Sequence, residues 1–215
     1  MRVLTLILAI ALAASPASAQ KRKAPAKKAP EKPAPTKTAT PDTRCPSLIG
    51  MGVKTVRSFC DVPVGRDPAQ GIVIALPAHT GPGTLTFDLH ARHVYSEDEM
   101  KRGKAFARYR AGIVAATMKG EVLTRAGVEA EFRSAADLFD RIGGGAGPGS
   151  LKAVAPAGRE PIIVTVPANV DQVSLLGETL DALTAAGKET AVMAGRPIAI
   201  VSNVLFEYRP APVKR

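Results

Sequence analysis

The sequence predicts an all-β protein: a single antiparallel β-sandwich, jelly-roll-like, with two short capping helices and a disordered tether ahead of it. Three observations predict this fold class. Apolar residues in the globular part recur mainly at every second position, as in strands with one buried face. Turn dipeptides such as Lys119-Gly120 and Gly187-Lys188 separate closely spaced runs, as in hairpins. The sequence also lacks the alternation of strands with long helices that a parallel sheet requires.

The first 19 residues have the organisation of a cleaved signal peptide. Arg2 supplies a positive charge, an apolar stretch runs from Leu4 to Ala14, and Ala17-Ser18-Ala19 matches the small-x-small cleavage rule. A membrane anchor is the alternative, but 11 apolar residues fall well short of the roughly 20 that cross a bilayer. We therefore expect residues 1–19 to be a signal peptide and the protein to be exported, either periplasmic or secreted.

Residues 20–44 are expected to form a disordered linker rich in Lys, Pro and Ala. They include no aromatic or large aliphatic side chain, so they cannot bury enough apolar surface to offset the entropy of ordering. Eight basic residues against two acidic ones give this linker a net charge of +6. We interpret it as a spacer. Its charge also suits a tether that contacts an anionic envelope surface, such as lipid headgroups or acidic wall polymer.

The positive charge of the chain lies in its tails, which argues against a nucleic-acid-binding protein. The formal net charge is +10, yet residues 45–208 hold 17 basic and 17 acidic residues. A nucleic-acid-binding domain carries a basic patch on the fold itself, and this balanced stretch offers none. Arg209 and the C-terminal tail, residues 211–215, hold the remaining basic residues after the linker.

Residues 45–210 are long enough for one domain with a substantial core, and no second low-complexity linker divides them. Cys45 and Cys60 are the only cysteines, and an even pair in an exported chain predicts a disulfide. Closing a loop of about 15 residues contributes roughly 3 kcal/mol in the chain-entropy model. We expect this bond to pin the start of the domain to its first strand.

Regular alternation predicts three long strands. In each, one face collects mostly apolar residues: Leu85, Phe87, Leu89 and Ala91; Val122, Thr124, Ala126, Val128, Ala130 and Phe132; and Ile198, Ile200, Ser202, Val204, Phe206 and Tyr208. Ser202 is the one break in the last of these faces. Shorter runs predict further strands at residues 71–76, 106–118, 162–166, 172–176, 178–183 and 189–193.

A turn at Lys119-Gly120 sets the register of the hairpin around it. Residues whose numbers sum to about 239 then face each other, so Glu129 meets Arg110 and Glu131 meets Arg108. This pairing accounts for both glutamates as cross-strand partners of arginines, and not as the two facing carboxylates of a glycosidase.

Two short helices are expected to interrupt the strands. Residues 96–99, Ser-Glu-Asp-Glu, form a capping box, and Gly103 ends that helix after two basic residues. Ser134 opens the second helix, which is expected to run through Ile142 into Gly143 and to cover an open end of the sandwich.

The three histidines, His79, His90 and His93, fall within 15 residues of each other. Asp88 and His90 share the outward face of a predicted strand, with alpha carbons about 7 Å apart. If His93 turns back at the strand end and His79 comes from a neighbouring strand, these four side chains form a metal site. The alternative is an exposed strand face that holds Asp88 and His90 without a ligand.

Tyr95 is the one candidate platform for stacking a sugar, because the chain has three tyrosines and no tryptophan. It follows His93 in a predicted loop, so the candidate ligand-binding residues are Tyr95, His93, Asp88 and His90. The glycine-rich run 143–149 lacks the Gly-Lys-Ser/Thr ending of a phosphate loop and is interpreted as a flexible connection. The sequence contains no nucleophile elbow, no His-Glu-x-x-His helix and no free thiol.

These observations favour an exported, non-enzymatic binding or structural module of the cell envelope. We expect no catalytic residue, no cofactor and no nucleic-acid partner. The expected partner is an envelope component, whether glycan, lipid surface or protein. One alternative is a metal-dependent or hydrolytic enzyme that uses His79, Asp88, His90 and His93. The other is an assembly subunit that pairs through a sheet edge.

Overall fold

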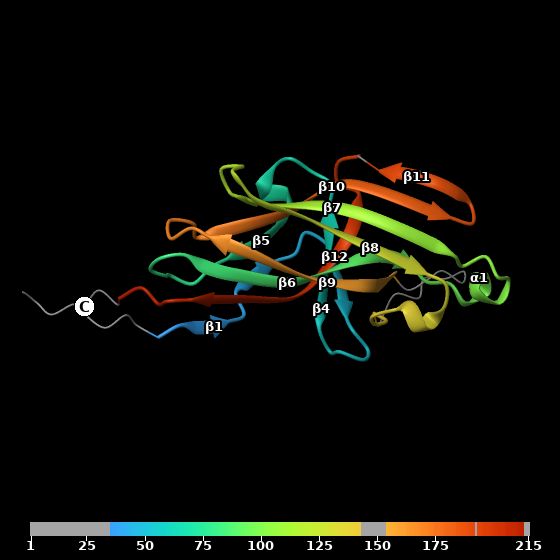
Figure 1. Ribbon diagram of the computed structural model, residues 1–215, viewed down its shortest axis with the longest axis horizontal. Coiled ribbons are helices and arrows are strands. Elements are labelled where there is room, and N and C mark those ends of the chain that lie inside the picture. Colours follow the sequence, from blue (N-terminus) through green and yellow to red (C-terminus); the bar gives the residue numbers. More distant parts are fainter. Residues whose placement is uncertain (1–34, 143–153, 192, 213–215) are drawn as a thin grey trace, which may run out of the picture. The chain divides into compact units, whose positions relative to one another are not determined.

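A computed structural model describes residues 35–142, 154–191 and 193–212, and it shows two packed antiparallel sheets (Figure 1). Sheet 1 has six strands in the order β3 (Leu48–Met51), β4 (Ser58–Pro63), β12 (Pro197–Tyr208), β6 (Gly83–Val94) and β9 (Val154–Val166), with β1 (Lys37–Ala39) also paired to β12. Sheet 2 has six strands in the order β2 (Asp42–Arg44), β5 (Ile72–Ala75), β10 (Gln172–Thr184), β7 (Ala107–Thr117) and β8 (Val122–Phe132), with β11 (Gly187–Ala191) also paired to β10. The predicted antiparallel sandwich is confirmed.

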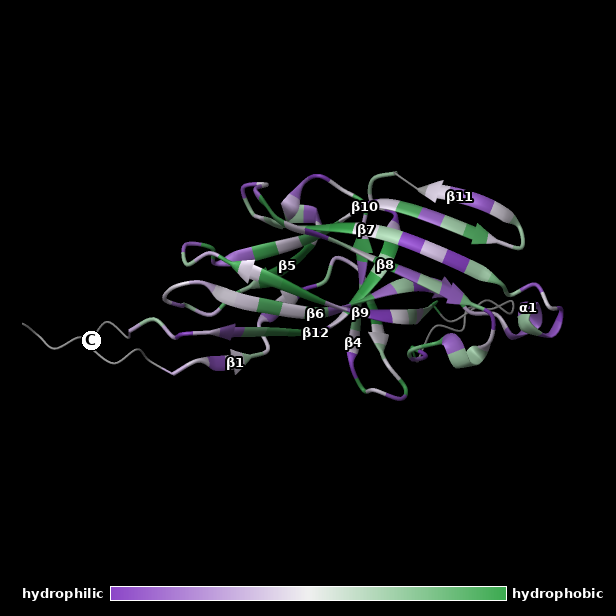
Figure 2. Cartoon of the chain, viewed as in Figure 1, coloured by the Kyte–Doolittle hydropathy of each residue, from purple (hydrophilic) through white to green (hydrophobic). Residues whose placement is uncertain are grey.

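The core lies between the sheets and follows the predicted alternation on β6. Leu85, Phe87, Leu89 and Ala91 all lie in the main buried cluster, together with Ile113 of β7. Hydrophobic residues gather along the middle of the sandwich, whereas β11 is largely hydrophilic (Figure 2). This clustering of apolar side chains between two sheets is the main stabilising contribution in a fold of this class.

The hairpin of β7 and β8 has the predicted register. Arg110 faces Glu129 and Arg108 faces Glu131, and the Arg110–Glu129 ion pair measures 3.0 Å. Gly120 has a φ of 84°, a conformation that favours glycine, and it makes the turn that sets this pairing. The glutamates therefore act as cross-strand partners on an exposed face.

Two bulges change what alternation alone predicts. Residues 172–176 and 178–183 form one strand, β10, whose register shifts between Gly177 and Thr179, so the break at Gly177 is a bulge and not a turn. The register of β12 shifts between Ser202 and Leu205, where Asn203 has a φ of 55°. The single face predicted for residues 198–208 is therefore wrong, because the bulge exchanges the two faces of the strand partway along it.

The first predicted helix is present, and the second is shorter than expected. The helix α1 (Glu97–Lys101) begins at Ser96, whose side chain accepts a hydrogen bond from the backbone of Glu99. Near Ser134 the chain makes only one 3₁₀ turn, η2 (Ala135–Asp137), and then becomes extended at Leu138. A further 3₁₀ turn, η1 (Pro68–Gln70), was not predicted.

Asp140 explains why the segment after η2 leaves the helical path. Its buried carboxylate accepts hydrogen bonds from the backbone of Lys54 at 2.9 Å, from Thr55 through both its backbone and its hydroxyl, and from the backbone of Arg141. Burial raises the pKa of Asp140, but these hydrogen bonds outweigh that effect and hold the pKa below its ordinary value. Residues 138–142 are thereby fixed as an extended cover next to the β3–β4 hairpin.

The ordered part of the chain begins before Cys45, where the linker was expected to end. Lys37 lies opposite Tyr208 in the pairing of β1 with β12, and β2 pairs with β5. The expected disorder of residues 37–44 is therefore wrong, because short polar strands can add to existing strands through backbone hydrogen bonds alone. Ala211, placed in the predicted tail, donates a backbone hydrogen bond to Ala78. The predicted signal peptide, linker residues 20–34 and the glycine-rich run 143–149 lie outside the described part.

The predicted disulfide joins Cys45 and Cys60, with alpha carbons 5.7 Å apart. Cys45 follows β2 of sheet 2, whereas Cys60 belongs to β4 of sheet 1, so the bond fastens the entering chain to the neighbour of β12. Within the described residues, no helix has the length and hydrophobicity needed to cross a membrane.

Candidate functional site

The structure separates the side chains that the metal hypothesis needs together. His79 lies ahead of β6 in the chain, where it bonds to the carbonyl of Pro77 at 2.9 Å and packs against Phe206. His90 and His93 lie on opposite faces of β6. His90 contacts Phe139, in the segment that covers the outer face of sheet 1, whereas His93 contacts Phe132 in the core between the sheets. Among the described residues, no group of three or more His, Cys, Asp or Glu side chains is placed to hold a metal ion. The expected convergence is not found.

Asp88 and His90 share a face, as expected, but that face is buried and not exposed. Asp88 forms ion pairs with Arg57 at 2.8 Å and with Arg159 at 3.0 Å. Asn203 adds a weaker hydrogen bond to the same carboxylate at 3.4 Å. A buried carboxylate with two arginine partners is satisfied without a ligand, so we assign Asp88 a structural role.

His90 is fully enclosed and both of its ring nitrogens have partners. Nδ1 donates to the carbonyl of Gly158 at 2.6 Å, which leaves Nε2 to accept from the hydroxyl of Ser202 at 3.0 Å. The ring lies against Phe59 and Phe139. Burial is the main cause that lowers the pKa of His90, so the ring stays neutral at pH 7.

Tyr95 is not an exposed platform. Its side chain belongs to the buried core, edge-on to Phe132, and the guanidinium of Arg141 covers the ring at 4.8 Å from its centroid. The Tyr95 hydroxyl accepts a hydrogen bond from Arg141 at 3.3 Å. A ring enclosed in this way cannot stack on a sugar.

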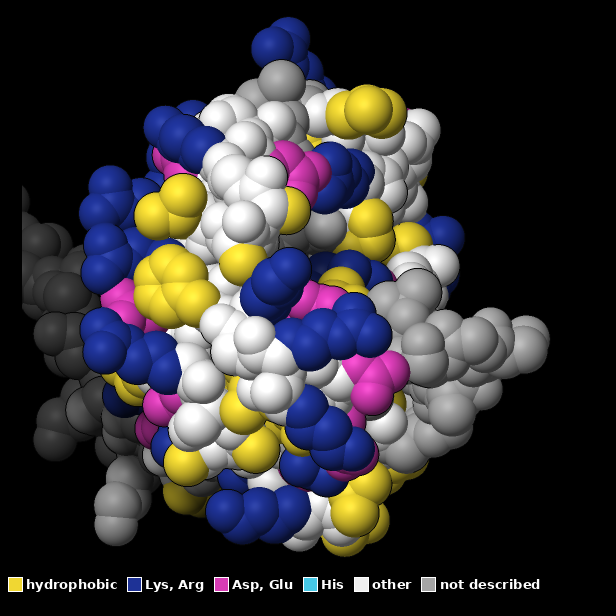
Figure 3. Space-filling view, turned by 90° about the vertical axis from the view of Figure 1, so that its right-hand side faces the viewer, with side chains coloured by type: hydrophobic (Ala, Val, Ile, Leu, Met, Phe, Trp, Pro, Cys, Tyr) yellow, Lys and Arg dark blue, Asp and Glu magenta, His cyan; other side chains and the backbone are white. Residues whose placement is uncertain are grey.

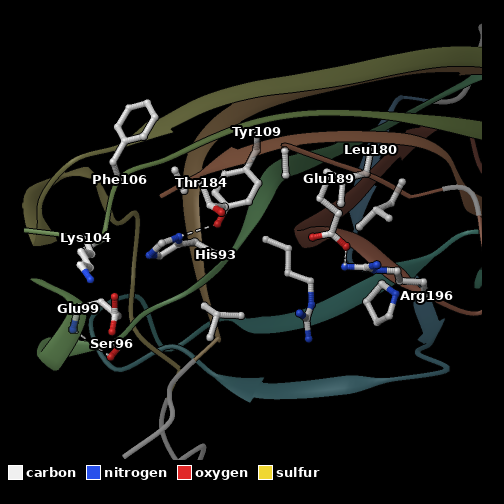
Figure 4. A pocket seen from close by; sticks show the side chains of 17 residues that line it. His93, Ser96, Glu99, Lys104, Phe106, Tyr109, Leu180, Thr184, Glu189 and Arg196 are labelled. Atoms are coloured by element: carbon white, nitrogen blue, oxygen red, sulfur yellow. Dashed lines mark hydrogen bonds and ion pairs between the residues drawn. The ribbon is translucent and has the colours of Figure 1, made fainter. Parts of the chain in front are cut away.

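His93, one of the predicted ligand-binding residues, lines a cavity. It points inward from the end of β6, is 4% exposed and stacks on Phe132 with centroids 3.8 Å apart. Its Nδ1 bonds to the hydroxyl of Tyr109 at 2.8 Å. Its Nε2 is buried and has no hydrogen-bond partner, the single buried side-chain polar atom of this kind among the described residues. Figure 4 shows this nitrogen turned away from Tyr109, toward the side formed by Ser96, Glu99 and Lys104.

The cavity, here called the end pocket, has a volume of about 270 Å³ and lies at the end of the sandwich that carries α1. Strands of both sheets contribute to it, because β6 and the start of β12 face β7, β10 and β11 across it. Its apolar wall is formed by Val94, Ala105, Phe106, Ala107, Leu180, Ala182, Pro197 and Ile198. Buried His93 and Tyr109 provide polar groups within that wall, an arrangement typical of small-molecule sites.

Charged groups surround the end pocket, and most of them are already paired. Arg92 pairs with Asp61 at 2.8 Å, and Arg196 pairs with Glu189. Figure 4 marks the Glu189–Arg196 pair with a dashed line, and Figure 3, which faces the α1 end, shows Lys and Arg side chains spread among Asp and Glu.

Glu99 is bonded to Arg102 at 3.4 Å. Lys104 is the lining cation for which the described residues provide no carboxylate within ion-pair distance. The end pocket therefore offers one uncompensated positive charge at its edge.

Burial sets the chemistry of the two central groups. It lowers the pKa of His93 to about 4 and raises the pKa of Tyr109 to about 12. Both groups are therefore neutral at pH 7, and they act through hydrogen bonds and not through charge. An imidazole with a pKa so far below neutrality is also a weak general base.

Sequence reasoning missed Tyr109, Lys104 and Arg196. The one usable signal for Tyr109 is its place in an inward-facing series with Ala107 and Ala111, where a phenol stands among small side chains. Lys104 and Arg196 gave no signal, since they meet in the end pocket only through the packing of β7 and β12.

Three wider cavities, of about 350, 700 and 730 Å³, also occur in the described part of the chain. None of the three is lined by His93, whose Nε2 is the single buried side-chain polar atom among the described residues without a partner. We therefore take the end pocket as the candidate site.

No protein-family model matches the sequence, and the comparison with curated proteins finds no match. Among solved structures, the chain is similar to a cleaved adhesin domain of Lys-gingipain from Porphyromonas gingivalis, with 10% sequence identity and a TM-score of 0.36. The alignment covers 82% of this chain and 99% of that domain. A TM-score this low establishes neither a shared fold nor a shared function.

Proposed function

We propose that this protein is an exported, non-enzymatic binding module of the cell envelope, and that the end pocket is its ligand-binding site. The unpartnered Nε2 of His93 carries this proposal. Leaving a buried polar group without a hydrogen bond costs about 1–3 kcal/mol. A ligand acceptor that reaches this nitrogen would recover that cost, and this supports the end pocket as a binding site.

Export is supported by the organisation of the chain. Residues 1–19 have the features of a signal peptide, and the Cys45–Cys60 bond suits an oxidising compartment. The basic residues of the linker would keep the domain near an anionic envelope surface. In this proposal the linker sets the location and the end pocket selects the ligand.

Filling the end pocket tests the proposal. Ala105 lines it and is partly buried, so Ala105→Phe is expected to weaken pocket ligands at least tenfold by occupying their space. Ala126 is also partly buried against the core but does not line the end pocket, and Ala126→Phe is the matched control. Ligands are identified with a fragment library of equal anionic, neutral and cationic shares, measured by saturation-transfer NMR on the mature protein. Hits that bind the Ala105→Phe variant as well as the wild type would refute the end pocket as the site.

The hydrolase alternative has one supporting observation, the hydrogen bond between Ser202 and His90. Both residues are almost fully buried, and His90 is closed in by two phenylalanine rings. We therefore expect a fluorophosphonate probe, which reacts with activated serines, to leave the wild-type protein unlabelled in intact mass spectra. Labelling that disappears in Ser202→Ala would replace the binding module with a hydrolase.

The edge-assembly alternative finds little support in the long edge strands. β9, at the edge of sheet 1, contains Pro156 and Pro161, which lack the N–H that an added strand needs. β8, at the edge of sheet 2, carries the charged pairs of Glu129 and Glu131. Prolines and charges of this kind prevent edge-to-edge pairing in natural sheets.

A further inference from the structure

The tautomer of His93 follows from the hydrogen bonds available around it. If Nδ1 carried the proton, it would donate to the Tyr109 oxygen, and the Tyr109 hydrogen would then lack an acceptor among the described residues. Nε2 would also lack a donor, so two buried groups would be unsatisfied. If Tyr109 donates to Nδ1 instead, only Nε2–H is left without a partner. The second arrangement leaves fewer polar groups unpaired and is therefore favoured.

His93 thus holds an N–H donor within the wall of the end pocket, and a ligand group that reaches it must be an acceptor. Figure 4 places Ser96, Glu99 and Lys104 on the side to which this nitrogen turns. The Ser96 oxygen accepts from the backbone of Glu99, and this leaves its hydroxyl hydrogen free to donate. Lys104 adds a positive charge that no carboxylate of the described residues neutralises.

We propose that the end pocket binds a small organic carboxylate, with its carboxylate group between His93 and Lys104 and its apolar body against Leu180 and Ile198. This inference rests on the proposed function and specifies its ligand. The cavity of about 270 Å³ is slightly smaller than the roughly 300–1,000 Å³ usual for ligand sites, which favours a small free acid. Glu99 and Glu189 also line the pocket, but each is paired with an arginine and so repels an anion only weakly.

Three probes of nearly equal shape test the ligand class: benzoate, benzamide and benzylamine. We expect calorimetry on the mature protein at pH 7 to show benzoate binding at least tenfold more tightly than the other two, because a hydrogen bond to a charged group is the stronger kind. His93→Phe keeps the aromatic stack on Phe132 and is expected to lose about tenfold or more in benzoate affinity. On binding, the Nε2 signal of His93 in long-range ¹H–¹⁵N spectra should remain that of a protonated nitrogen.

Lys104→Gln provides a second variant that leaves the core intact, since Lys104 is exposed. It is expected to weaken benzoate by about threefold while leaving benzamide unchanged, as for a partly solvated charge pair. Lys101→Gln is its control, because Lys101 lies in α1 but does not line the pocket.

Benzamide or benzylamine binding as tightly as benzoate would overturn the carboxylate class, and so would equal losses in the two lysine variants. Neither result would touch the proposed function, which depends on the Ala105→Phe comparison.

Discussion

Acidification from pH 7 to pH 4 is expected to lower the free energy of unfolding by on the order of 3 kcal/mol through His93 alone. Burial lowers the pKa of His93 from its ordinary 6.5 to about 4 in the folded protein. Each unit of difference between the folded and unfolded pKa corresponds to about 1.4 kcal/mol. Because the unfolded chain takes up the proton first, this contribution is complete above pH 6.5 and is lost as the pH falls toward 4.

Urea unfolding of the wild type and of His93→Phe at several pH values between 4 and 8 measures this effect. The variant is expected to show a shallower loss of stability on acidification, with some slope remaining because burial also lowers the pKa of His90. His79→Phe is the control, since it removes a histidine from outside the end pocket and is expected to keep the full slope. Parallel curves for the wild type and His93→Phe would contradict the buried, neutral state of His93.

Asp140→Ala is expected to destabilise the domain by about 3 kcal/mol. The carboxylate accepts from the backbones of Lys54, Thr55 and Arg141 and from the hydroxyl of Thr55, and alanine would leave all four donors without this acceptor. Unsatisfied buried donors cost about 1–3 kcal/mol each, less where water reaches them. Because Asp140 joins the cover of sheet 1 to the β3–β4 turn, we expect the loss to appear in both segments.

Thermal unfolding with hydrogen exchange at residues 53–55 and 138–142 tests this expectation. Asp137→Ala is the matched control: Asp137 also accepts backbone hydrogen bonds, but it is exposed and caps only a single 3₁₀ turn. A cost of about 1 kcal/mol is expected there. If the two variants lose equal stability, Asp140 does not anchor the cover.

Local patterns were sufficient to predict the strands of the core and one hairpin register. The alternation from Leu85 to Ala91 identifies the inner face of β6, because a strand at the centre of a sandwich buries one face against the opposite sheet. The charges of Arg110 and Glu129 agree with the turn between them, and the structure pairs them. Both cases depend on residues close together in the chain or on a period of two.

The errors arise where distant segments meet. Asp88 and His90 lie on the face expected to be exposed, but Phe139 and its neighbours cover it, and nothing in the sequence of β6 signals that cover. A bulge at Asn203 exchanges the inward and outward faces of β12, and the alternation of apolar and polar residues does not reveal it. His93 was expected to lie beside the other histidines, whereas in the structure it bonds to Tyr109.

The disulfide determines where a force applied to the N-terminal side of the chain reaches the sandwich. A pull on the chain ahead of Lys37 would first detach β1 and then β2, each held by a three-residue pairing. The tension would then reach Cys45 and pass through the disulfide to Cys60 in β4, beside β12. The β3–β4 turn between the two cysteines is thereby shielded from tension. An oxidised domain held by its N-terminal side would extend by only a short length before the sandwich itself resists, whereas reduction would let the same force unravel the hairpin.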